Sequence, residues 1–165
     1  MTFEQLVAKF DTSRMLDLIL SEPIELEKFY ESYGEIGLPG RVHSAPLPRV
    51  PSKVIFTGMG GSAIVGDFVR SLLLDRASSA VEVVRDFKLP FHAGRGDVLI
   101  AVSYSGNTVE TLRCAKEGVE RGCYLVAVTS GGLLERYASK LGATVYMLPA
   151  GRPPRTALAP MLAAA

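Results

Sequence analysis

The feature that most constrains the fold is an alternation of short apolar runs with helix-patterned segments from Lys53 onward, joined by glycine-rich turns. Five runs are predicted to be strands: Val54–Thr57, Val81–Arg85, Val98–Val102, Tyr124–Thr129 and Thr144–Leu148. Helical periodicity is found in Ala63–Leu74, Thr108–Arg121 and Leu133–Lys140, and Pro90–Gly96 is predicted to be a loop. Strands joined through helices run parallel, and continuously apolar strands are buried on both faces. The pattern therefore predicts an α/β fold: an open five-stranded parallel sheet with helices on both faces.

The first fifty residues follow a different pattern. Asp11-Thr12-Ser13 offers helix-capping side chains before a helix that begins near Met15. Pro23 suits the first turn of a second helix, which is predicted to end at Gly34. Pro39, Gly40, Pro46, Pro48 and Pro51 then predict an extended arm. We expect residues 1–50 to be a helical N-terminal segment with this arm, and residues 51–165 to be one α/β domain.

Composition limits the classes of function. The chain has 165 residues and a net charge of +1 without a basic block, so neither nucleic acid nor a membrane surface is an expected partner. No apolar run is long enough to span a bilayer, and residues 1–10 lack the features of a signal peptide, which predicts a cytoplasmic protein. The two cysteines, Cys114 and Cys123, lack metal-ligand spacing and are expected to be free, half-buried thiols.

Three glycine- and hydroxyl-rich clusters follow predicted strands: Gly58–Ser62, Ser103–Gly106 and Thr129–Gly132. Because the carboxyl ends of parallel strands meet at one edge of a sheet, all three are expected on the rim where open α/β sheets bind ligands. The second cluster continues to Thr108 and leads directly into a helix. The hydroxyls of Ser103, Ser105 and Thr108 then converge on a helix N-terminus, which carries unpaired N–H donors and positive partial charge. The run predicts a site for a small phosphorylated ligand.

Purely structural explanations exist for these turns. Glycines and hydroxyls also make tight strand-to-helix connections, and we favour that interpretation for Thr129–Gly132 taken alone. Asn107 with Glu110 has the pattern of a helix cap and its reciprocal carboxylate. Gly58–Ala63 also fits the dinucleotide pattern G-x-G-x-x-A, with Asp86 as the ribose-binding carboxylate. A dinucleotide is disfavoured because it leaves the hydroxyl-rich turn unexplained.

Other candidate residues are less constrained. Arg155 follows Pro153 and Pro154, which stiffen the chain and favour a guanidinium held over the rim, although a solvated loop arginine fits equally well. His43 and His92 fall in predicted loops, and neither belongs to a recognisable acid/base pair. No carboxylate follows a rim cluster closely enough to be named as a general base.

At these residues the sequence resembles the sugar isomerase (SIS) domain and, more narrowly, the N-terminal half of the bifunctional phosphoglucose/phosphomannose isomerases. The resemblance rests on four segments that span nearly the whole chain in order: Asp11–Met15, Gly58–Ala63, Ser103–Thr108 and Pro153–Arg155. The run Ser-Tyr-Ser-Gly-Asn-Thr is typical of SIS domains. The glycine run and Pro-Pro-Arg narrow the resemblance to the phosphoglucose/phosphomannose isomerases.

The resemblance implies specific roles. Ser103, Ser105 and Thr108 would hold the phosphate of a sugar phosphate, while Gly60, Gly61 and Ser62 would line the sugar pocket. Arg155 would be catalytic, stabilising an enediolate. The implied enzyme is a sugar-phosphate isomerase of carbohydrate metabolism that converts glucose 6-phosphate and mannose 6-phosphate to fructose 6-phosphate by ring opening and proton transfer between C2 and C1. Neither a metal nor an organic cofactor is implied.

One departure from the family is large. Its members are longer and carry a second SIS domain that supplies the base glutamate, the ring-opening histidine and a lysine, partly across a homodimer interface. The apolar stretch 157–165 is expected to be an exposed tail with a partner surface, as in a chain truncated before that domain. This chain would then supply the phosphate-binding half and would not turn over substrate alone. The alternative is a single SIS domain that senses a sugar phosphate.

Overall fold

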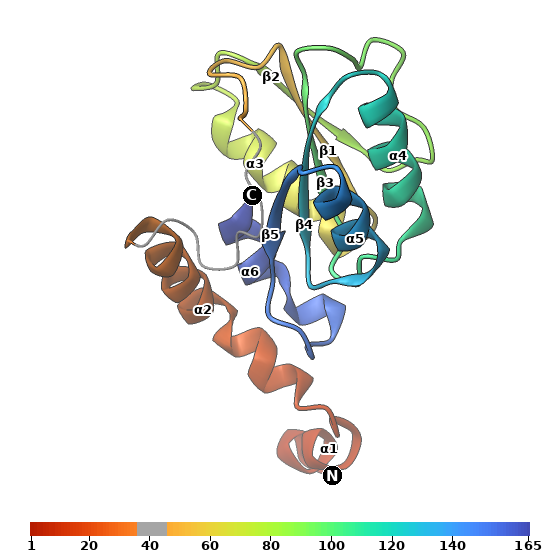
Figure 1. The fold of residues 1–165 in the computed structure, drawn as a ribbon. Coiled ribbons are helices and arrows are strands. Elements are labelled where there is room, and N and C mark those ends of the chain that lie inside the picture. Colours follow the sequence, from red (N-terminus) through yellow and green to blue (C-terminus); the bar gives the residue numbers. More distant parts are fainter. Residues whose placement is uncertain (36–45) are drawn as a thin grey trace.

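A five-stranded, all-parallel sheet forms the centre of the molecule (Figure 1). The computed structural model describes residues 1–35 and 46–165. The strands are β1 Lys53–Thr57, β2 Ala80–Val84, β3 Val98–Val102, β4 Tyr124–Thr129 and β5 Thr144–Met147. The helices are α1 Phe3–Phe10, α2 Met15–Glu35, α3 Gly61–Leu73, α4 Val109–Glu120, α5 Gly132–Lys140 and α6 Leu158–Ala164, with a short 3-10 helix, η1, at Pro154–Thr156. The predicted fold class is confirmed.

The strand order, β2-β1-β3-β4-β5, determines where a ligand can bind. The chain passes from β1 outward to β2 and then returns to β3 on the other side of β1. Helices that follow β1 and β3 therefore leave the sheet in opposite directions, which opens a crevice at the carboxyl ends of these two strands. The glycine turn after β1 and the hydroxyl turn after β3 flank that crevice.

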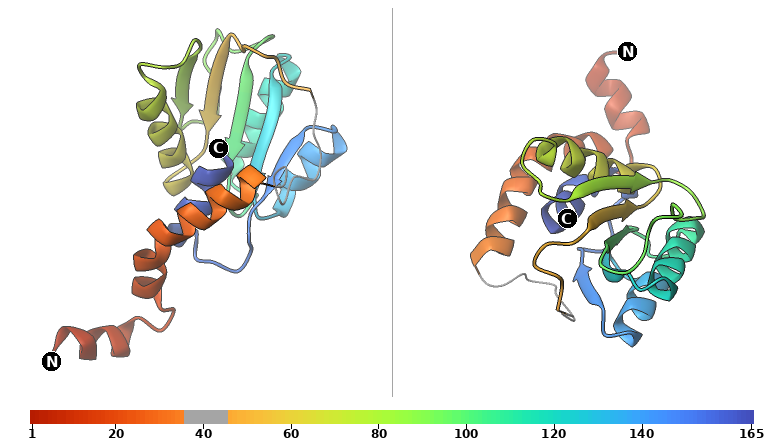
Figure 2. Two further views of the ribbon diagram at one scale, coloured as in Figure 1. Left: turned by 90° about the vertical axis from the view of Figure 1, so that its left-hand side faces the viewer. Right: turned by 90° about the horizontal axis from the view of Figure 1, so that it is seen from above.

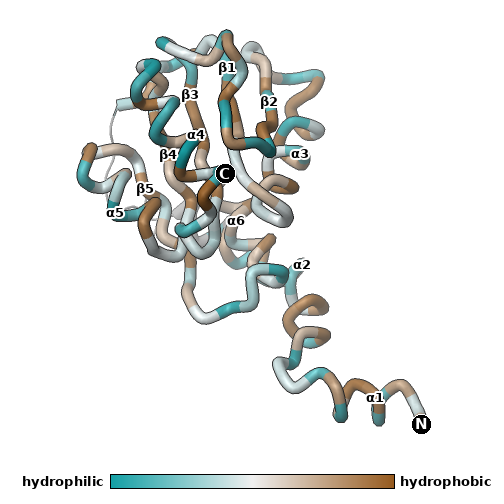
Figure 3. The backbone as a smooth tube through the Cα atoms, turned by 90° about the vertical axis from the view of Figure 1, so that its right-hand side faces the viewer, coloured by the Kyte–Doolittle hydropathy of each residue, from teal (hydrophilic) through white to brown (hydrophobic). Residues whose placement is uncertain are grey.

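Helices cover both faces of the sheet, as Figure 2 shows. On one face α4 and α5 bury small side chains such as Cys114, Ala115 and Ala138 against the strands. On the other face α3 and α6 contribute Val65 and Met161. The strands themselves supply the continuous apolar core, seen in Figure 3 as brown segments inside the molecule. The sheet is thus buried on both sides, as parallel sheets usually are.

The N-terminal segment differs from the sequence expectation. A single helix, α2, runs through Pro23 instead of ending before it and restarting. Pro23 removes one backbone donor, yet the packing of α2 along α6 keeps the helix continuous. The expected capping is present, since both carboxylate oxygens of Asp11 accept hydrogen bonds from the N–H groups of Met15 and Leu16, at 2.7 and 2.8 Å.

Helix α1 was not predicted. It begins with a capping box in which Thr2 and Gln5 exchange hydrogen bonds, a short signal easily overlooked. None of its residues is buried, and it projects away from the rest of the chain (Figure 2). Pro39, Gly40 and His43 lie outside the described residues, so the predicted arm is seen only from Pro46 on, where residues 46–52 form neither helix nor strand.

The expected exposed tail is wrong. Residues of 157–165 fold into α6, which packs between the sheet and α2, and Ala157, Ala159 and Met161 are at most 3% exposed. The Glu22 side chain on α2 accepts a hydrogen bond from the Ala159 N–H at 2.6 Å. The apolar stretch therefore finds its partner surface within this chain.

Two remaining expectations concern the cysteines and the membrane. Cys114 and Cys123 are free and are buried rather than half-buried, at 0% and 8% exposed, and burial raises the pKa of each thiol. Across the described residues, no helix combines the length and apolarity needed for a bilayer crossing.

Candidate functional site

A cleft of about 230 Å³ opens at the crevice beyond the carboxyl ends of β1 and β3. Three segments far apart in the sequence form its wall: the turn after β1, the turn after β3, and η1. Its lining residues are Met59, Gly61, Ser62, Tyr104, Ser105, Thr108, Pro154 and Arg155. Five of the seven residues predicted for the site are among them. Gly60 and Ser103 are not.

The turn after β1 brings α3 close to the neighbouring strand. A Cβ on Gly58 would lie 3.0 Å from the carbonyl oxygen of Val102 at the end of β3, so this close approach favours glycine. Gly60 is the N-terminal cap of α3, is exposed, and has a positive φ of 53°. Gly61 and Ser62 are the first residues of α3 and face the cleft. The helix therefore points its N-terminus at the cleft.

Of the three predicted hydroxyls in the turn after β3, two line the cleft and one is buried below them. Ser103 is 1% exposed, and its Oγ lies 2.9 Å from the Thr108 Oγ1, within hydrogen-bond distance. Ser105 is exposed and its Oγ accepts a hydrogen bond from the Asn107 N–H at 3.2 Å. Ser105 and Thr108 thus line the cleft, whereas Ser103 supports Thr108 from beneath.

Asn107 does not act as a helix cap with Glu110. Thr108 is the residue that precedes α4, and it makes no capping hydrogen bond. The Asn107 Oδ1 accepts a hydrogen bond from the Leu133 N–H at 3.1 Å, and its Nδ2 donates to the Ser105 carbonyl at 3.1 Å. Asn107 therefore ties the turn after β3 to the start of α5.

The third predicted cluster, Thr129–Gly132, holds the other turns in place. The Ser130 Oγ donates to the Tyr104 carbonyl at 2.6 Å, and the Thr129 Oγ1 donates to the Gly131 carbonyl at 2.8 Å. None of its residues lines the cleft. This agrees with the structural interpretation preferred for that cluster.

Arg155 lies on η1 at the cleft, which is one of the two alternatives that the sequence left open. It is exposed and, of the described residues that line the cleft, it alone is charged. Within the described residues its guanidinium has no hydrogen-bond or ion-pair partner, so it is available to a ligand. Its neighbour Arg152 is instead bound to Glu25 on α2.

Tyr104 is a cleft residue that sequence reasoning missed. Its hydroxyl donates to the Pro149 carbonyl at 2.8 Å and accepts from the Arg152 N–H at 3.0 Å. The only signal for it was an aromatic residue inside a hydroxyl-rich turn. Tyr104 links the turn after β3 to the segment that carries Arg155.

The electrostatics of the cleft favour an anion. Helices α3 and α4 lie on opposite faces of the sheet, and both begin at the cleft, so two positive dipole ends meet there with Arg155. The lining set includes neither a carboxylate nor a histidine, and the part of the chain that the structure describes holds no group of side chains able to bind a metal ion. The cleft can hold a phosphate group, but the described residues that line it offer no general base.

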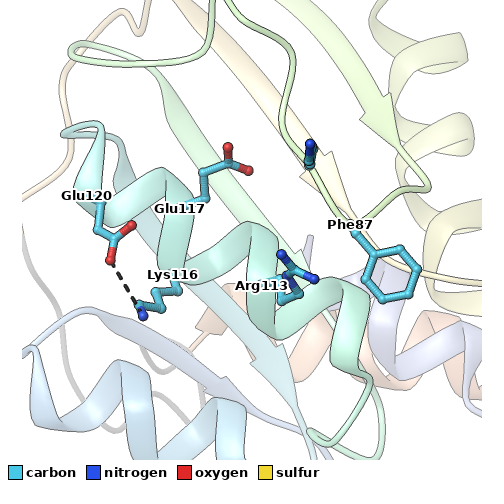
Figure 4. Close-up of a pocket in the computed structure, with 6 residues that line it drawn as sticks. Phe87, Arg113, Lys116, Glu117 and Glu120 are labelled. Atoms are coloured by element: carbon cyan, nitrogen blue, oxygen red, sulfur yellow. Dashed lines mark ion pairs between the residues drawn. The ribbon is translucent and has the colours of Figure 1, made fainter.

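A second hollow, of about 330 Å³, lies on the outer face of α4 (Figure 4). Its charges are mixed and largely paired: Lys116 lies 3.7 Å from Glu120, and Glu117 pairs with Arg121. Arg113 lies over the Phe87 ring, 5.8 Å from its centroid. None of the predicted site residues lines this hollow, so volume alone does not make it the candidate site.

Comparison with known proteins shows the family of this chain. Residues 49–147 match the family described as the SIS domain. The chain is 36% identical over 144 residues to the bifunctional phosphoglucose/phosphomannose isomerase of Caldicellulosiruptor bescii, covering 87% of this chain and 41% of that protein. It is 37% identical over 149 residues to the protein of the same name from Pyrobaculum calidifontis, covering 89% and 48%. A D-glucosamine-6-phosphate 4-epimerase of Sulfolobus acidocaldarius is 32% identical over 127 residues, covering 76% and 40%.

Solved structures share the fold at low sequence identity. The C-terminal domain of glucosamine-fructose-6-phosphate aminotransferase from Francisella tularensis superposes with a TM-score of 0.63 at 16% identity, covering 91% of this chain and 45% of that one. Tagatose-6-phosphate ketose/aldose isomerase from Escherichia coli gives a TM-score of 0.54 at 23% identity, covering 88% and 40%.

The chain spans less than half the length of these curated relatives. The family match contains both turns that line the cleft, while Arg155 lies beyond it. The fold, the two turns and the match over residues 49–147 lead to one assignment: this chain belongs to the SIS domain family.

Proposed function

We propose that this chain binds a hexose 6-phosphate in the cleft and supplies the substrate-binding half of a phosphoglucose/phosphomannose isomerase. One observation carries the proposal: the hydroxyls of Ser105 and Thr108, the N-termini of α3 and α4 and the guanidinium of Arg155 surround a single cleft. Helix N-termini with nearby hydroxyls are a common phosphate site, and a charged ligand strengthens each hydrogen bond.

The size of the cleft fits half of a site. Its 230 Å³ is below the roughly 300–1,000 Å³ of complete small-molecule pockets. We place the phosphate against Ser105 and Thr108, with Ser103 fixing Thr108, and the sugar along Gly61 and Ser62. Gly60 orients this wall by starting α3.

The proposed reaction opens the sugar ring and moves a proton between C2 and C1 through an enediolate. Arg155 would face the negative charge that develops on the sugar oxygens, where a fixed cation lowers the barrier. The proton at C2 requires a base, and the residues that line this cleft include none. The base and the ring-opening acid would come from another domain or another subunit.

The names of the relatives support a shared ligand more strongly than a shared reaction. Two are called isomerases of phosphoglucose and phosphomannose, and one is called an epimerase of D-glucosamine 6-phosphate. All three names contain a six-carbon sugar with a phosphate. The phosphate-binding part of the proposal is accordingly the part to test first.

The cellular compartment and the oligomeric state are also part of the proposal. We expect the full-length protein to be a cytoplasmic homodimer that acts on a small sugar phosphate. The net charge of +1 supports a partner other than nucleic acid or a membrane surface.

The test is a calorimetric titration of this chain with fructose 6-phosphate, with fructose and inorganic phosphate as controls. We expect weak binding of fructose 6-phosphate, weaker binding of phosphate and none of fructose, together with negligible isomerase activity. Equal binding of fructose and fructose 6-phosphate would contradict the phosphate site. Measurable turnover by the chain alone would contradict its role as half of an enzyme.

A second function, a regulatory SIS domain that senses a sugar phosphate, is favoured by the same lack of a base in the cleft. It differs in requiring no second domain. The DNA downstream of codon 165 separates the two: a reading frame that continues into another SIS domain excludes the sensor, and a stop codon there favours it.

A further inference from the structure

Among the described residues the Arg155 guanidinium has no partner, so its place at the cleft depends on the segment of chain that carries it. That chain is the segment from Pro149 to η1, which leaves the sheet after the Leu148 N–H donates to the Thr129 carbonyl at 2.8 Å. Inside the segment, the Thr156 N–H and hydroxyl both bond the Pro153 carbonyl, at 2.9 and 3.0 Å. These bonds shape η1 but do not attach it to the rest of the molecule.

The attachment comes from Arg152. Its guanidinium contacts both carboxylate oxygens of Glu25 on α2, one of them at 2.8 Å, and reaches the Thr156 carbonyl at 3.5 Å. A two-pronged arginine–carboxylate contact fixes orientation as well as distance. The Glu25 and Arg152 side chains are 19% and 21% exposed, so solvent screens them less than a surface pair.

Two more contacts come from elements that flank the cleft. Tyr104, in the turn after β3, bonds both the Pro149 carbonyl and the Arg152 N–H. On the far side of Arg155, Glu22 on α2 bonds the Ala159 N–H. The backbone is thus held both before and after Arg155, by α2 on each side and by the turn after β3 in addition.

We propose that the Glu25–Arg152 pair, together with Tyr104, positions Arg155 at the cleft. Helix α2, which carries Glu25, therefore contributes to the site. The expected effect of this pair on ligand binding rests on the function proposed above. Its expected effect on the position of Arg155 is independent of that function. None of the three residues needs to touch the sugar for this role, since they act through the backbone of Pro149–Thr156.

The first experiment needs no ligand. The variant Arg155→Cys is labelled with a nitroxide, and its mobility is measured by electron paramagnetic resonance in the full 165-residue chain. Cys114 is 0% and Cys123 is 8% exposed, and the chain with Arg155 intact, treated with the same reagent, measures any labelling of these two thiols. Adding Glu25→Gln or Arg152→Lys is expected to increase the mobility of the label at position 155, because lysine keeps the charge but loses the two-pronged contact.

Two controls separate positioning from general destabilisation. Glu117→Gln breaks the pair with Arg121 at the C-terminal end of α4, the end that points away from the cleft, where the two side chains are 27% and 31% exposed; it is expected to leave the label at 155 unchanged. A label introduced by Lys140→Cys at the end of α5 is expected to be unaffected by Glu25→Gln. Unchanged mobility at position 155 in both Glu25→Gln and Arg152→Lys would overturn the inference.

The second experiment measures coupling to Arg155. The ligand is 6-phosphogluconate, whose carboxylate lies at C1, near the sugar oxygens on which the enediolate charge would develop. Glu25→Gln is expected to weaken its binding by about threefold or more in the wild-type background, and to have little effect once Arg155→Ala is present. Equal losses in both backgrounds would overturn the inference. If wild-type chain binds neither 6-phosphogluconate nor fructose 6-phosphate, the proposed function fails, while the label experiment still decides the positioning role.

Discussion

At the scale of single residues, the hydroxyls of the turn after β3 differ in exposure and in role. Ser105 is exposed at the cleft, whereas Ser103, two positions earlier, is buried and hydrogen-bonded to Thr108. A buried hydroxyl that orients a ligand-facing hydroxyl affects binding indirectly. Its loss also removes a buried hydrogen bond and leaves the Thr108 hydroxyl without this partner, and this lowers stability.

Replacing Ser105 and Thr108 by alanine is expected to weaken fructose 6-phosphate binding. Each lost hydrogen bond to a charged phosphate is worth about 1.5–3 kcal/mol, and calorimetry of the single and double variants measures it. Ser103→Ala is the matched comparison, expected to lower the melting temperature as well as the affinity. If the double variant binds as tightly as the wild type, the turn is merely structural.

Arg155→Ala tests the charge on η1 in a full-length enzyme that contains this domain. We expect turnover to fall by about 100-fold or more, as when other oxyanion-stabilising donors are removed, and KM to change far less. The reason is that the charge facing Arg155 appears only during the reaction. Similar losses in kcat and in affinity would instead make Arg155 a substrate-holding residue.

At the scale of elements, the turns after β3 and β4 interlock through glycine. Gly106 has a φ of +67°, and a Cβ there would lie 1.7 Å from the Gly131 carbonyl oxygen. Gly106→Ala is therefore expected to destabilise the chain by about 4 kcal/mol or more in denaturant unfolding.

Gly142→Ala is the control for backbone conformation alone. Its φ is +66°, but a Cβ there meets nothing within 4 Å, so only the left-handed strain of about 1–2 kcal/mol is expected. Equal effects of the two substitutions would show that the two turns do not need to approach so closely.

The pair that joins α2 to η1 gives a pH prediction. Hydrogen bonding to Arg152 holds the pKa of Glu25 below its ordinary value, so the folded state favours the carboxylate. A depressed carboxyl pKa stabilises the fold fully above the ordinary glutamate value of about 4.3, and this contribution is lost as the pH falls through the lower folded value.

Denaturant unfolding at several pH values tests the direction of this pH dependence of stability. Wild type is expected to exceed Glu25→Gln in stability by about 1–2 kcal/mol near pH 7, with the difference shrinking toward zero as the pH falls below about 4. Asp17→Asn, which removes an exposed partner of Arg14, is expected to cost no more than about 0.5 kcal/mol at any pH. A gap between wild type and Glu25→Gln that widens in acid would contradict the assignment.

At the scale of the whole molecule, the α/β core was predictable because its information is local. Apolar strands such as Val98–Val102 end at glycines or hydroxyls, and each strand lies within one residue of its predicted bounds. The N-terminal helices were harder to predict, because Pro23 signals a helix start unless tertiary packing overrides it. The tail at 157–165 was misjudged because its partner, α2, lies more than a hundred residues earlier in the sequence.

The same distinction applies to the cleft. Ser105 and Thr108 could be predicted from their place at a helix N-terminus, and Gly61 and Ser62 from their glycine turn. Tyr104 could not be, since its partners Pro149 and Arg152 meet it only in the folded chain. For the same reason the sequence left the position of Arg155 open, and only the folded chain shows η1 at the cleft.

The central claim, that the turn after β3 captures a phosphate, is tested most directly by a crystal structure of this chain with fructose 6-phosphate. We expect the phosphate within hydrogen-bond distance of the Ser105 and Thr108 hydroxyls and of the first N–H groups of α4, with Arg155 on the sugar side. A phosphate bound elsewhere, for example against Arg113 and Lys116, with the turn empty, would contradict it.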